Sequence, residues 1–152
     1  MYTQHEIAIK EHLLWWRKLK SSRTRVDCIY QYEGIDAGVV SLTEIDDSNS
    51  TASWAFYAAP DAAKGTGSRM EFLALEYALV ERGLHKLCCE VLSFITGVVA
   101  MHKKFGFRLE GLLRDQKRIN GAYVDVCRFG ILQDEWATNR QAMEDTIIRR
   151  LK

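Results

Sequence analysis

The sequence predicts an α+β fold in which helices flank a mostly antiparallel sheet. Apolar residues recur in the order helix, three strands, helix, strand, helix, two strands, helix. The dipeptide Asn120-Gly121 lies between two strand-like segments and favours a type I′ turn, which joins antiparallel strands. Ser41 and Thr43 alternate with apolar neighbours, as in a strand with one covered face.

The first part of the chain predicts a helix followed by three strands. Residues 5–20 place Ile9, Leu13 and Trp16 on one helical face. The three strand-like segments that follow are 26–32, 37–45 and 51–58, and the first turn is Glu33-Gly34-Ile35-Asp36.

The second part of the chain predicts three helices and three strands. A helix over 67–82 is apolar on most sides, so it should pack against a sheet and end at Gly83 in the C′ position. The segment 86–92 predicts a strand that is buried on both faces. The remaining elements are a helix over 96–105, the Asn-Gly hairpin, and a last helix over 133–151.

Composition indicates one domain spanning residues 1–152, because 47% hydrophobic content in 152 residues can form a sizeable core. A net charge of +1 argues against nucleic acid or an anionic membrane as a partner. No apolar run approaches the ~20 residues of a membrane span, and the N-terminus lacks a signal-peptide pattern, so we expect a cytoplasmic protein. Four cysteines without metal-ligand spacing predict reduced core thiols and no bound metal: Cys28, Cys88, Cys89 and Cys127.

A glycine-containing turn precedes the helix over 67–82. Gly65 and Gly67 let an anion approach backbone N–H groups at the positive end of the helix dipole, and Lys64 and Arg69 add charge. The lysine precedes the glycines, unlike a Walker loop, and no third glycine completes a dinucleotide fingerprint. The pattern favours a phosphate-bearing ligand other than ATP or NAD, although Gly-x-Gly before a helix is often only a tight turn.

Two segments together resemble the GNAT family of acetyl-CoA-dependent N-acetyltransferases. The family's phosphate loop, Gln/Arg-x-x-Gly-x-Gly/Ala, falls on Ala62-Ala63-Lys64-Gly65-Thr66-Gly67. Its later motif, Asn-x-x-Ala-x-x-x-Tyr-x-Lys-x-Gly-Phe, falls on residues 95–107. The chain departs from the family at Ala62, at Ile95 in place of Asn, and at His102 in place of Tyr. Residues 107–114 and 133–136 resemble the ribosomal-protein acetyltransferase branch of the family.

Further segments resemble one subfamily, the nucleotide-amino-sugar acetyltransferases of the pseudaminic acid pathway, which serves the glycosylation of flagellin or of a surface polysaccharide. These segments are Met1-Tyr2, His12-Leu13, Ser41-Leu42-Thr43, Trp54-Ala55-Phe56-Tyr57, Lys64-Gly65-Thr66-Gly67, Ala74-Leu75-Glu76-Tyr77 and His102 to Phe107. The resemblance implies acetyl-CoA as co-substrate and UDP-4-amino-4,6-dideoxy-N-acetyl-β-L-altrosamine as acceptor. Such proteins usually carry a strand and a helix before the Met-Tyr segment. The chain is therefore expected to lack the usual first strand, and a homodimer could cover the open sheet edge.

The resemblance also implies a cofactor site. Backbone amides near Phe56, Tyr57 and Ala58 would stabilise the oxyanion, and space between that strand and the Glu90 strand would hold the pantetheine arm. The residues expected to anchor the phosphates are Lys64, Gly65, Thr66, Gly67, Ser68, Arg69 and Lys104.

Three residues are candidates for proton transfer. His102 occupies the position of the family's thiol-protonating tyrosine, and an imidazole is a common proton donor in catalysis; alternatively it is a helix histidine satisfied at the edge of the core. Glu90 lies in an apolar strand and would act as a general base toward the amine, or form a structural ion pair. Ser41 would relay a proton or hold the amine, or be an ordinary strand hydroxyl.

Aromatic and thioether side chains suit the uracil ring and the 6-deoxy methyl group of such a sugar. The residues expected on this side are Met1, Tyr2, His12, Trp15 and Tyr57. Three other functions remain open: acetylation of a protein N-terminus, which needs an open peptide groove, acyl-CoA binding without turnover, and acetylation of another small amine.

Overall fold

Six strands form one mixed sheet in the computed structural model, which describes residues 22–151. The spatial order of the strands is β1-β2-β3-β4-β6-β5. Every neighbouring pair is antiparallel except β3 and β4, which are parallel, so the predicted mostly antiparallel sheet is confirmed. The strands are β1 (Val26–Tyr32), β2 (Ile35–Asp46), β3 (Thr51–Ala58), β4 (Lys86–Leu92), β5 (Arg108–Ile119) and β6 (Ala122–Leu132).

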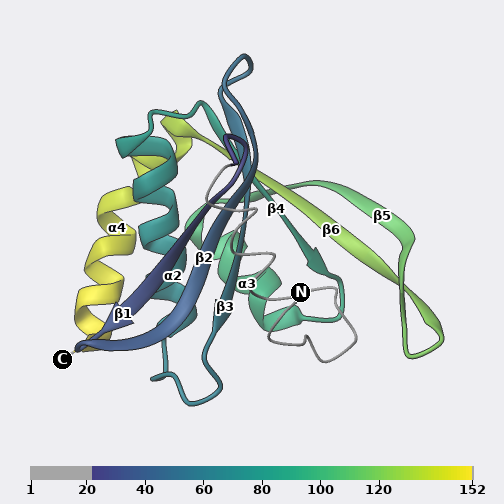
Figure 1. Ribbon diagram of the computed structural model, residues 1–152, viewed down its shortest axis with the longest axis horizontal. Helices are drawn as coiled ribbons and strands as arrows, with labels where there is room; N and C mark the ends of the chain where they lie inside the picture. Colours follow the sequence, from purple (N-terminus) through teal and green to yellow (C-terminus); the bar gives the residue numbers. More distant parts are fainter. Residues whose placement is uncertain (1–21, 152) are drawn as a thin grey trace.

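The helical segments pack together behind the sheet (Figure 1). They are α2 (Thr66–Leu75), the π-helical segment η1 (Glu76–Glu81), α3 (Thr96–Phe105) and α4 (Gln133–Leu151). Helix α2 lies on β2 and β3 and also contacts α3 and α4. The predicted apolar helix is therefore buried between the sheet and two other helices. Met70 and Leu75 of α2 and Leu79 of η1 are fully inaccessible to solvent.

Both predicted hairpin turns have the backbone conformation that tight turns between twisted strands require. Glu33 and Gly34 have φ angles of 51° and 77°, and Asn120 and Gly121 have 49° and 82°. Positive φ at both central residues is the signature of a type I′ turn. The first turn is shorter than predicted because β2 begins at Ile35, which pairs with Tyr32.

The helix expected over 67–82 ends differently from its prediction. Its α-helical part stops at Leu75, and the next six residues form the π-helical segment, with Arg82 N–H bonded to the Tyr77 carbonyl at 2.9 Å. Gly83 follows with φ 64°, and Leu84 N–H bonds back to the Ala78 carbonyl at 3.0 Å. The Leu84 bond spans one residue more than the corresponding bond of a Schellman motif, because the preceding turn is π-helical. Gly83 follows the cap residue Arg82 in the left-handed conformation, so the predicted C′ glycine is confirmed.

The prediction that β4 is buried on both faces is wrong. Leu87, Cys89 and Val91 are buried toward the helices, whereas Glu90 is exposed on the opposite face. The reason is that the described helices cover only one face of the sheet, so alternate residues of the strand face away from them. We call this second side the open face.

The cysteines are only partly the core thiols that the sequence predicts. Cys89 and Cys127 are buried, but Cys88 is half-buried and Cys28 is exposed, and all four are free thiols. Within residues 22–151 no helix is long and apolar enough to cross a membrane. The helix predicted over 5–20 lies outside the described residues.

Candidate active site

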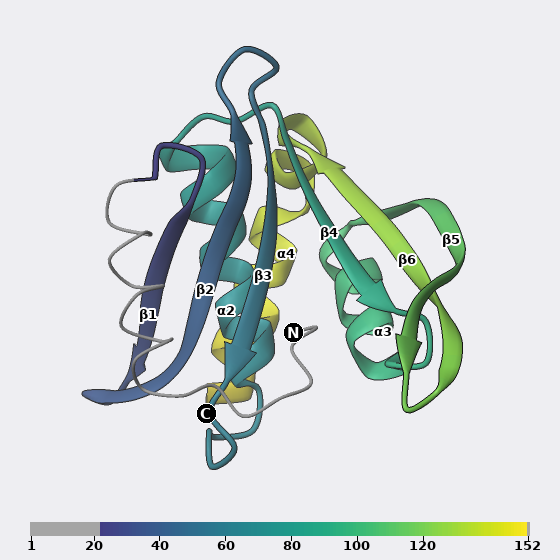
Figure 2. The same cartoon turned by 45° about the vertical axis from the view of Figure 1, so that its right-hand side comes forward.

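A hollow opens where β3 and β4 diverge. The two strands pair only at Thr51–Lys86, Ala52–Leu87 and Ser53–Cys88 and then separate, as Figure 2 shows. The edge of β3 from Trp54 onward is therefore not paired with β4. A cavity of about 160 Å³ occupies this gap, and its walls come from β3, β4 and α3.

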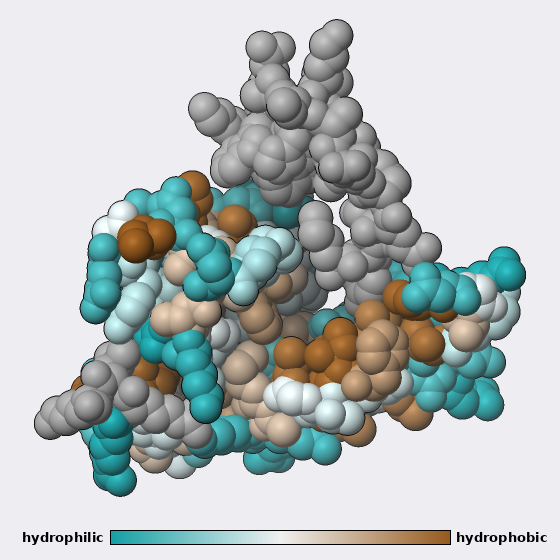
Figure 3. All heavy atoms as spheres, turned by 90° about the horizontal axis from the view of Figure 1, so that it is seen from below, coloured by the Kyte–Doolittle hydropathy of each residue, from teal (hydrophilic) through white to brown (hydrophobic). Residues whose placement is uncertain are grey.

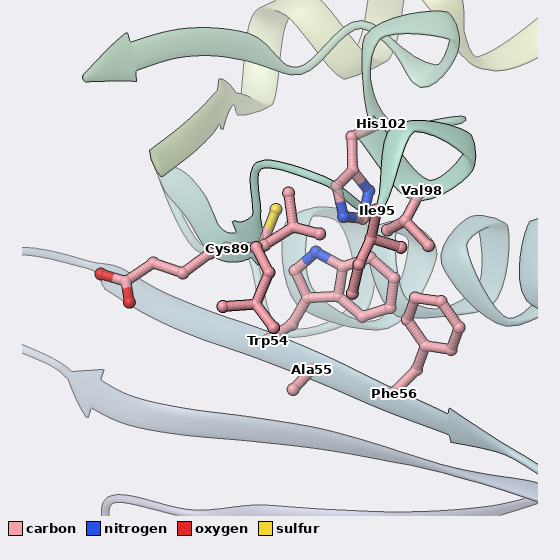
Figure 4. Close-up of a pocket in the computed structure, with 10 residues that line it drawn as sticks. Trp54, Ala55, Phe56, Cys89, Ile95, Val98 and His102 are labelled. Atoms are coloured by element: carbon pink, nitrogen blue, oxygen red, sulfur yellow. The ribbon is translucent and has the colours of Figure 1, made fainter. Parts of the chain in front are cut away.

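The walls of this hollow are mainly apolar. Figure 4 shows Trp54 and Phe56 from β3, Cys89 from β4 and His102 from α3 converging on it. Trp54 is at the centre, because its ring stacks on Phe56 at 5.4 Å and meets the His102 imidazole edge-on at 5.7 Å. Such a slot suits an extended chain of modest polarity, with polar groups confined to a few wall atoms.

The predicted anion loop lies at the start of α2. Gly65 precedes the helix with φ 86°, a conformation that L side chains rarely adopt, and it caps the helix without a side-chain hydrogen bond. Thr66 is held by its own N–H and hydroxyl, which donate to the Ala63 carbonyl at 3.1 and 2.6 Å. The amides of Gly67 and Ser68 in the first helical turn have no intrahelical carbonyl to bond, so they face the mouth of the helix.

A second cavity, of about 540 Å³, lies at this loop and is lined by Lys64, Gly65, Ser68, Arg69 and Ile147. The guanidinium of Arg69 is already anchored to β1. Its Nε donates to the Tyr30 hydroxyl at 3.0 Å, and its Cζ lies 4.4 Å from the centre of the Tyr32 ring. The structure therefore brings one tethered cation and one lysine to the helix mouth, an arrangement that favours an anion.

Lys104 lies beside the same helix start. It lines a small groove with Ser68, Phe105 and residues of α4, among them Met143 and Ile147. The sequence-predicted phosphate residues from Lys64 to Arg69 and Lys104 are thus close together, although α3 and the loop are distant in sequence.

His102 is buried and paired with an acid that the sequence reasoning missed. Its side chain is 3% exposed, and its Nδ1 lies 2.7 Å from Oε1 of Glu71, which is fully buried. Burial raises the pKa of the Glu71 carboxyl, and the hydrogen bond from His102 partly opposes this shift. Glu71 is an acid within an apolar run, Met70-Glu71-Phe72. This is the same pattern that made Glu90 a candidate, so the sequence could also have identified Glu71.

Glu90 has a different environment from the one that suggested its role. It contributes to the wall of the hollow, but its side chain is 36% exposed and its Oε1 lies 3.8 Å from Nη1 of Arg128. The burial expected to perturb this carboxylate is absent, because Glu90 is on the open face. What remains is an acid at the rim of the hollow, next to a cation.

Ser41 does not line the hollow. Its hydroxyl donates to Oδ1 of Asp27 on β1, and Arg25 donates to both carboxylate oxygens of Asp27 at 2.9 Å. Burial by itself raises the pKa of Asp27, but the bonds from Arg25 and Ser41 outweigh it, so the net pKa is lowered. The hydroxyl is therefore occupied by this cluster on the open face.

The remaining sequence-predicted residues lie in different places. Phe56 lies in the hollow, whereas Tyr57 is on the open face with 53% of its surface exposed. Ala58 ends β3. It pairs with Gly38 of β2 and has no partner on β4. The residues predicted for the sugar side, Met1, Tyr2, His12 and Trp15, lie outside the described residues.

The end of the molecule seen from below carries an apolar surface. Figure 3 shows hydrophobic side chains in the middle of this face and hydrophilic ones around much of its rim. Phe94 and Ile95, at the entrance of α3, are 56% and 38% exposed.

No group of three or more His, Cys, Asp or Glu residues within 22–151 is placed to hold a metal ion.

Comparison with known proteins gives related acetyltransferases. The profile of the acetyltransferase (GNAT) domain family matches residues 8–127. Spermidine N(1)-acetyltransferase of Escherichia coli strain K12 is 27% identical over 122 residues, which are 80% of this chain and 66% of the relative. The Vibrio cholerae spermidine N(1)-acetyltransferase is 33% identical over 100 residues, 65% of this chain and 58% of that protein. The match thus spans less than two thirds of the length of these curated relatives.

Solved structures agree with the fold. Spermidine/spermine N-acetyltransferase from Vibrio cholerae, in complex with manganese ions, superposes with a TM-score of 0.81 at 26% identity, covering 87% of this chain and 79% of that one. A dodecameric form of the Vibrio cholerae enzyme gives 0.79 at 27% identity, covering 85% and 77%. These relatives are named for polyamine acetylation, and none of them is named for a nucleotide sugar. With the parallel strands that diverge over a hollow, the glycine loop at the helix mouth and a family match over most of its length, the chain belongs to the GNAT acetyltransferase domain family.

Proposed function

We propose that this protein transfers the acetyl group of acetyl-CoA to the 4-amino group of a UDP-linked 4-amino-4,6-dideoxy sugar. The observation that carries the acetyl-transfer part is the hollow between β3 and β4, with the glycine loop at α2 beside β3. Amides at Gly67 and Ser68, with Lys64 and Arg69, would hold the phosphates, and the slot beside Trp54 would hold the pantetheine arm. The residues present therefore fit the co-substrate.

The reaction needs a neutral amine, a stabilised oxyanion and a proton for the departing thiolate. Glu90 at the rim of the hollow is placed to take a proton from the acceptor ammonium, directly or through water. The unpaired edge of β3 offers amides near Phe56 to the oxyanion. His102 in the wall is placed to protonate the thiolate.

The charges near the hollow support an anionic acceptor in preference to a polycation. A polyamine needs carboxylates that lack a cation of their own, because each of its ammonium groups must be neutralised. At the rim of the hollow Glu90 lies beside Arg128, whose side chain is 50% exposed, and farther away on the open face Asp27 is bonded to Arg25. A diphosphate near the open face would instead gain from Arg128.

The names of the curated relatives favour spermidine, so the experiment compares acceptors directly. Thiol release from acetyl-CoA is measured with the UDP-4-amino sugar, with spermidine and with a peptide bearing a free N-terminus, and the acetylated products are identified by mass. We expect release to depend on the sugar and to fall sharply in Glu90→Gln. A higher kcat/KM with spermidine than with the sugar would identify a polyamine as the acceptor. Tight binding of acetyl-CoA without thiol release in the presence of any amine would indicate a binding domain.

Arg128→Gln tests the charge argument separately. We expect it to raise KM for the UDP-sugar while KM for acetyl-CoA stays the same. Arg108→Gln is the matched control, because this exposed cation lies on β5, pairs with Glu135 at 2.9 Å and does not line the hollow. Equal effects of the two variants would contradict a diphosphate contact at Arg128.

A further inference from the structure

Glu71 and His102 form a buried pair, of which His102 lines the hollow. Glu71 is on α2, six residues after the glycine at the helix start, and His102 is on α3. Their side chains are 0% and 3% exposed and are joined by the 2.7 Å contact between Oε1 and Nδ1. The pair therefore links α2, the helix of the anion loop, to α3, the helix that lines the hollow.

This contact determines which imidazole nitrogen is available for chemistry. Because Nδ1 is engaged by Glu71, Nε2 is the nitrogen that remains on a residue lining the hollow. Aromatic rings hold the imidazole in place: Trp54, Phe107 and Phe129 have their centroids 5.7, 5.5 and 5.8 Å from it. The orientation of the ring is thus set by packing as well as by the hydrogen bond.

Burial also affects how many protons the pair holds. A carboxylate with a neutral imidazole would leave one net negative charge away from water, which is costly, and burial accordingly raises the pKa of Glu71. One additional proton makes the pair neutral. If this additional proton is on His102, or is shared between Oε1 and Nδ1, then Nε2 carries a hydrogen. Placed on Oε2, it would create a buried hydroxyl without an acceptor, since Oε2 has no partner among the described residues.

The surroundings of the pair add few other charges. β3 and β6 contribute the rings of Trp54 and Phe129 at the imidazole, Phe107 lies there just before β5, and β2 packs apolar residues on α2. β4 contributes the thiol of Cys89, whose pKa is raised mainly by burial and further by Glu71, and Glu90 lies at the rim. On the α4 side, Arg140 is bonded to Glu76 and Glu144. Lys103 and Lys104 on α3 itself are exposed.

We propose that Glu71 is a positioning residue that keeps Nε2 of His102 protonated and directed into the hollow, ready to protonate the departing thiolate. This inference rests on the acetyl transfer proposed above. As the carbon–sulfur bond breaks, sulfur takes the bonding electron pair and the proton of Nε2. The other proton of the pair remains on Nδ1, bonded to the Glu71 carboxylate. The pair regains its lost proton from solvent, and the acceptor amine releases one proton as its amide bond forms.

The direct test is the protonation state of His102 in the wild-type enzyme. Nitrogen-15 NMR of the imidazole at neutral pH, assigned by comparison with His102→Gln, distinguishes a protonated from a bare Nε2. We expect a hydrogen on Nε2 and a hydrogen-bonded Nδ1. A bare Nε2 would overturn the proposal. This measurement requires neither an acceptor nor a variant of Glu71.

Kinetics test the consequence. Glu71→Gln keeps the size of the side chain but cannot hold the additional proton, so the alkaline limb of the kcat profile should move to lower pH. We expect kcat at pH 8 to fall about 10- to 100-fold, with KM for acetyl-CoA unchanged. Glu76→Gln is the control, since Glu76 is the next acid along and accepts bonds from Trp136 and Arg140 at 2.9 and 2.8 Å. It should lower thermal stability without moving the profile.

The double variant separates positioning from general damage. In a His102→Gln background, Glu71→Gln should cause no further loss of kcat, because the group through which Glu71 acts is absent. Additive losses, or a loss that is equal at all pH values, would contradict the proposal. Failure of the proposed function is distinguishable: no amine would accelerate thiol release in wild type, while the NMR result would still show whether Nε2 is protonated.

Discussion

Replacing Gly65 by alanine should weaken acetyl-CoA binding, whereas the same change at Gly83 should not. Both glycines flank the same helical segment, and both have positive φ, 86° and 64°. A Cβ at Gly65 would lie 3.4 Å from Nη1 of Arg69, and one at Gly83 would meet nothing within 4 Å. The two variants therefore carry the same kind of backbone strain, but only one changes the anion loop.

The expected size follows from the backbone conformation. A non-glycine residue in the left-handed region costs about 1–2 kcal/mol. Gly83→Ala should lose this in full as stability, whereas Gly65→Ala should divide it between stability and binding. For a chain of this length this corresponds to a melting temperature lower by about 2–8 °C. At Gly65 the strain is relieved if the loop leaves this conformation, which moves the amides of the helix mouth away from the phosphates. If the whole strain appears in binding, affinity falls by about tenfold for each 1.4 kcal/mol.

Thermal unfolding and titration calorimetry with acetyl-CoA measure the two effects on the same samples. We expect a loss of melting temperature in Gly65→Ala that is no larger than in Gly83→Ala, and a larger dissociation constant only in Gly65→Ala. Dissociation constants equal to the wild-type value in both variants would refute the assignment of this helix mouth to the co-substrate. Equal losses of affinity would mean that binding reports general destabilisation.

Two further predictions concern the sheet that supports the site. Gly38→Ala should destabilise the protein by about 1–3 kcal/mol or more, because the added Cβ would lie 2.5 Å from the carbonyl oxygen of Tyr57. An unchanged midpoint of urea unfolding would contradict this close approach of β2 and β3. Asp27→Asn should lower stability near neutral pH, because the lowered pKa of Asp27 reflects bonds from Arg25 and Ser41 to its ionised form. That contribution to stability is complete above the ordinary pKa of 3.8 and is lost as pH falls through the native pKa. In urea unfolding at several pH values, the stability difference between wild type and variant should therefore shrink below pH 3.8. A difference that stays constant with pH would argue against it.

The sequence predicted the elements well where a local signal was strong. Asn120-Gly121 defined a hairpin, Gly83 defined a helix end, and the segments 86–92, 96–105 and 133–151 have the predicted bounds. These features depend on neighbours a few residues apart, through turn conformation or hydrophobic periodicity, so a single sequence contains the information. The glycine loop before α2 was predicted for the same reason.

The functional pairs depended on contacts between residues distant in the sequence. Glu71 and His102 are 31 residues apart, and Ser41 meets Asp27 across 14 residues. Glu90 resembled a buried acid because its neighbours along the chain are apolar, yet strand alternation and the one-sided cover of helices put it on the open face. By itself the sequence determined the local elements, the loop and the family resemblance. Only the tertiary structure decided which acid is buried against which base, because burial depends on the elements that pack across the sheet.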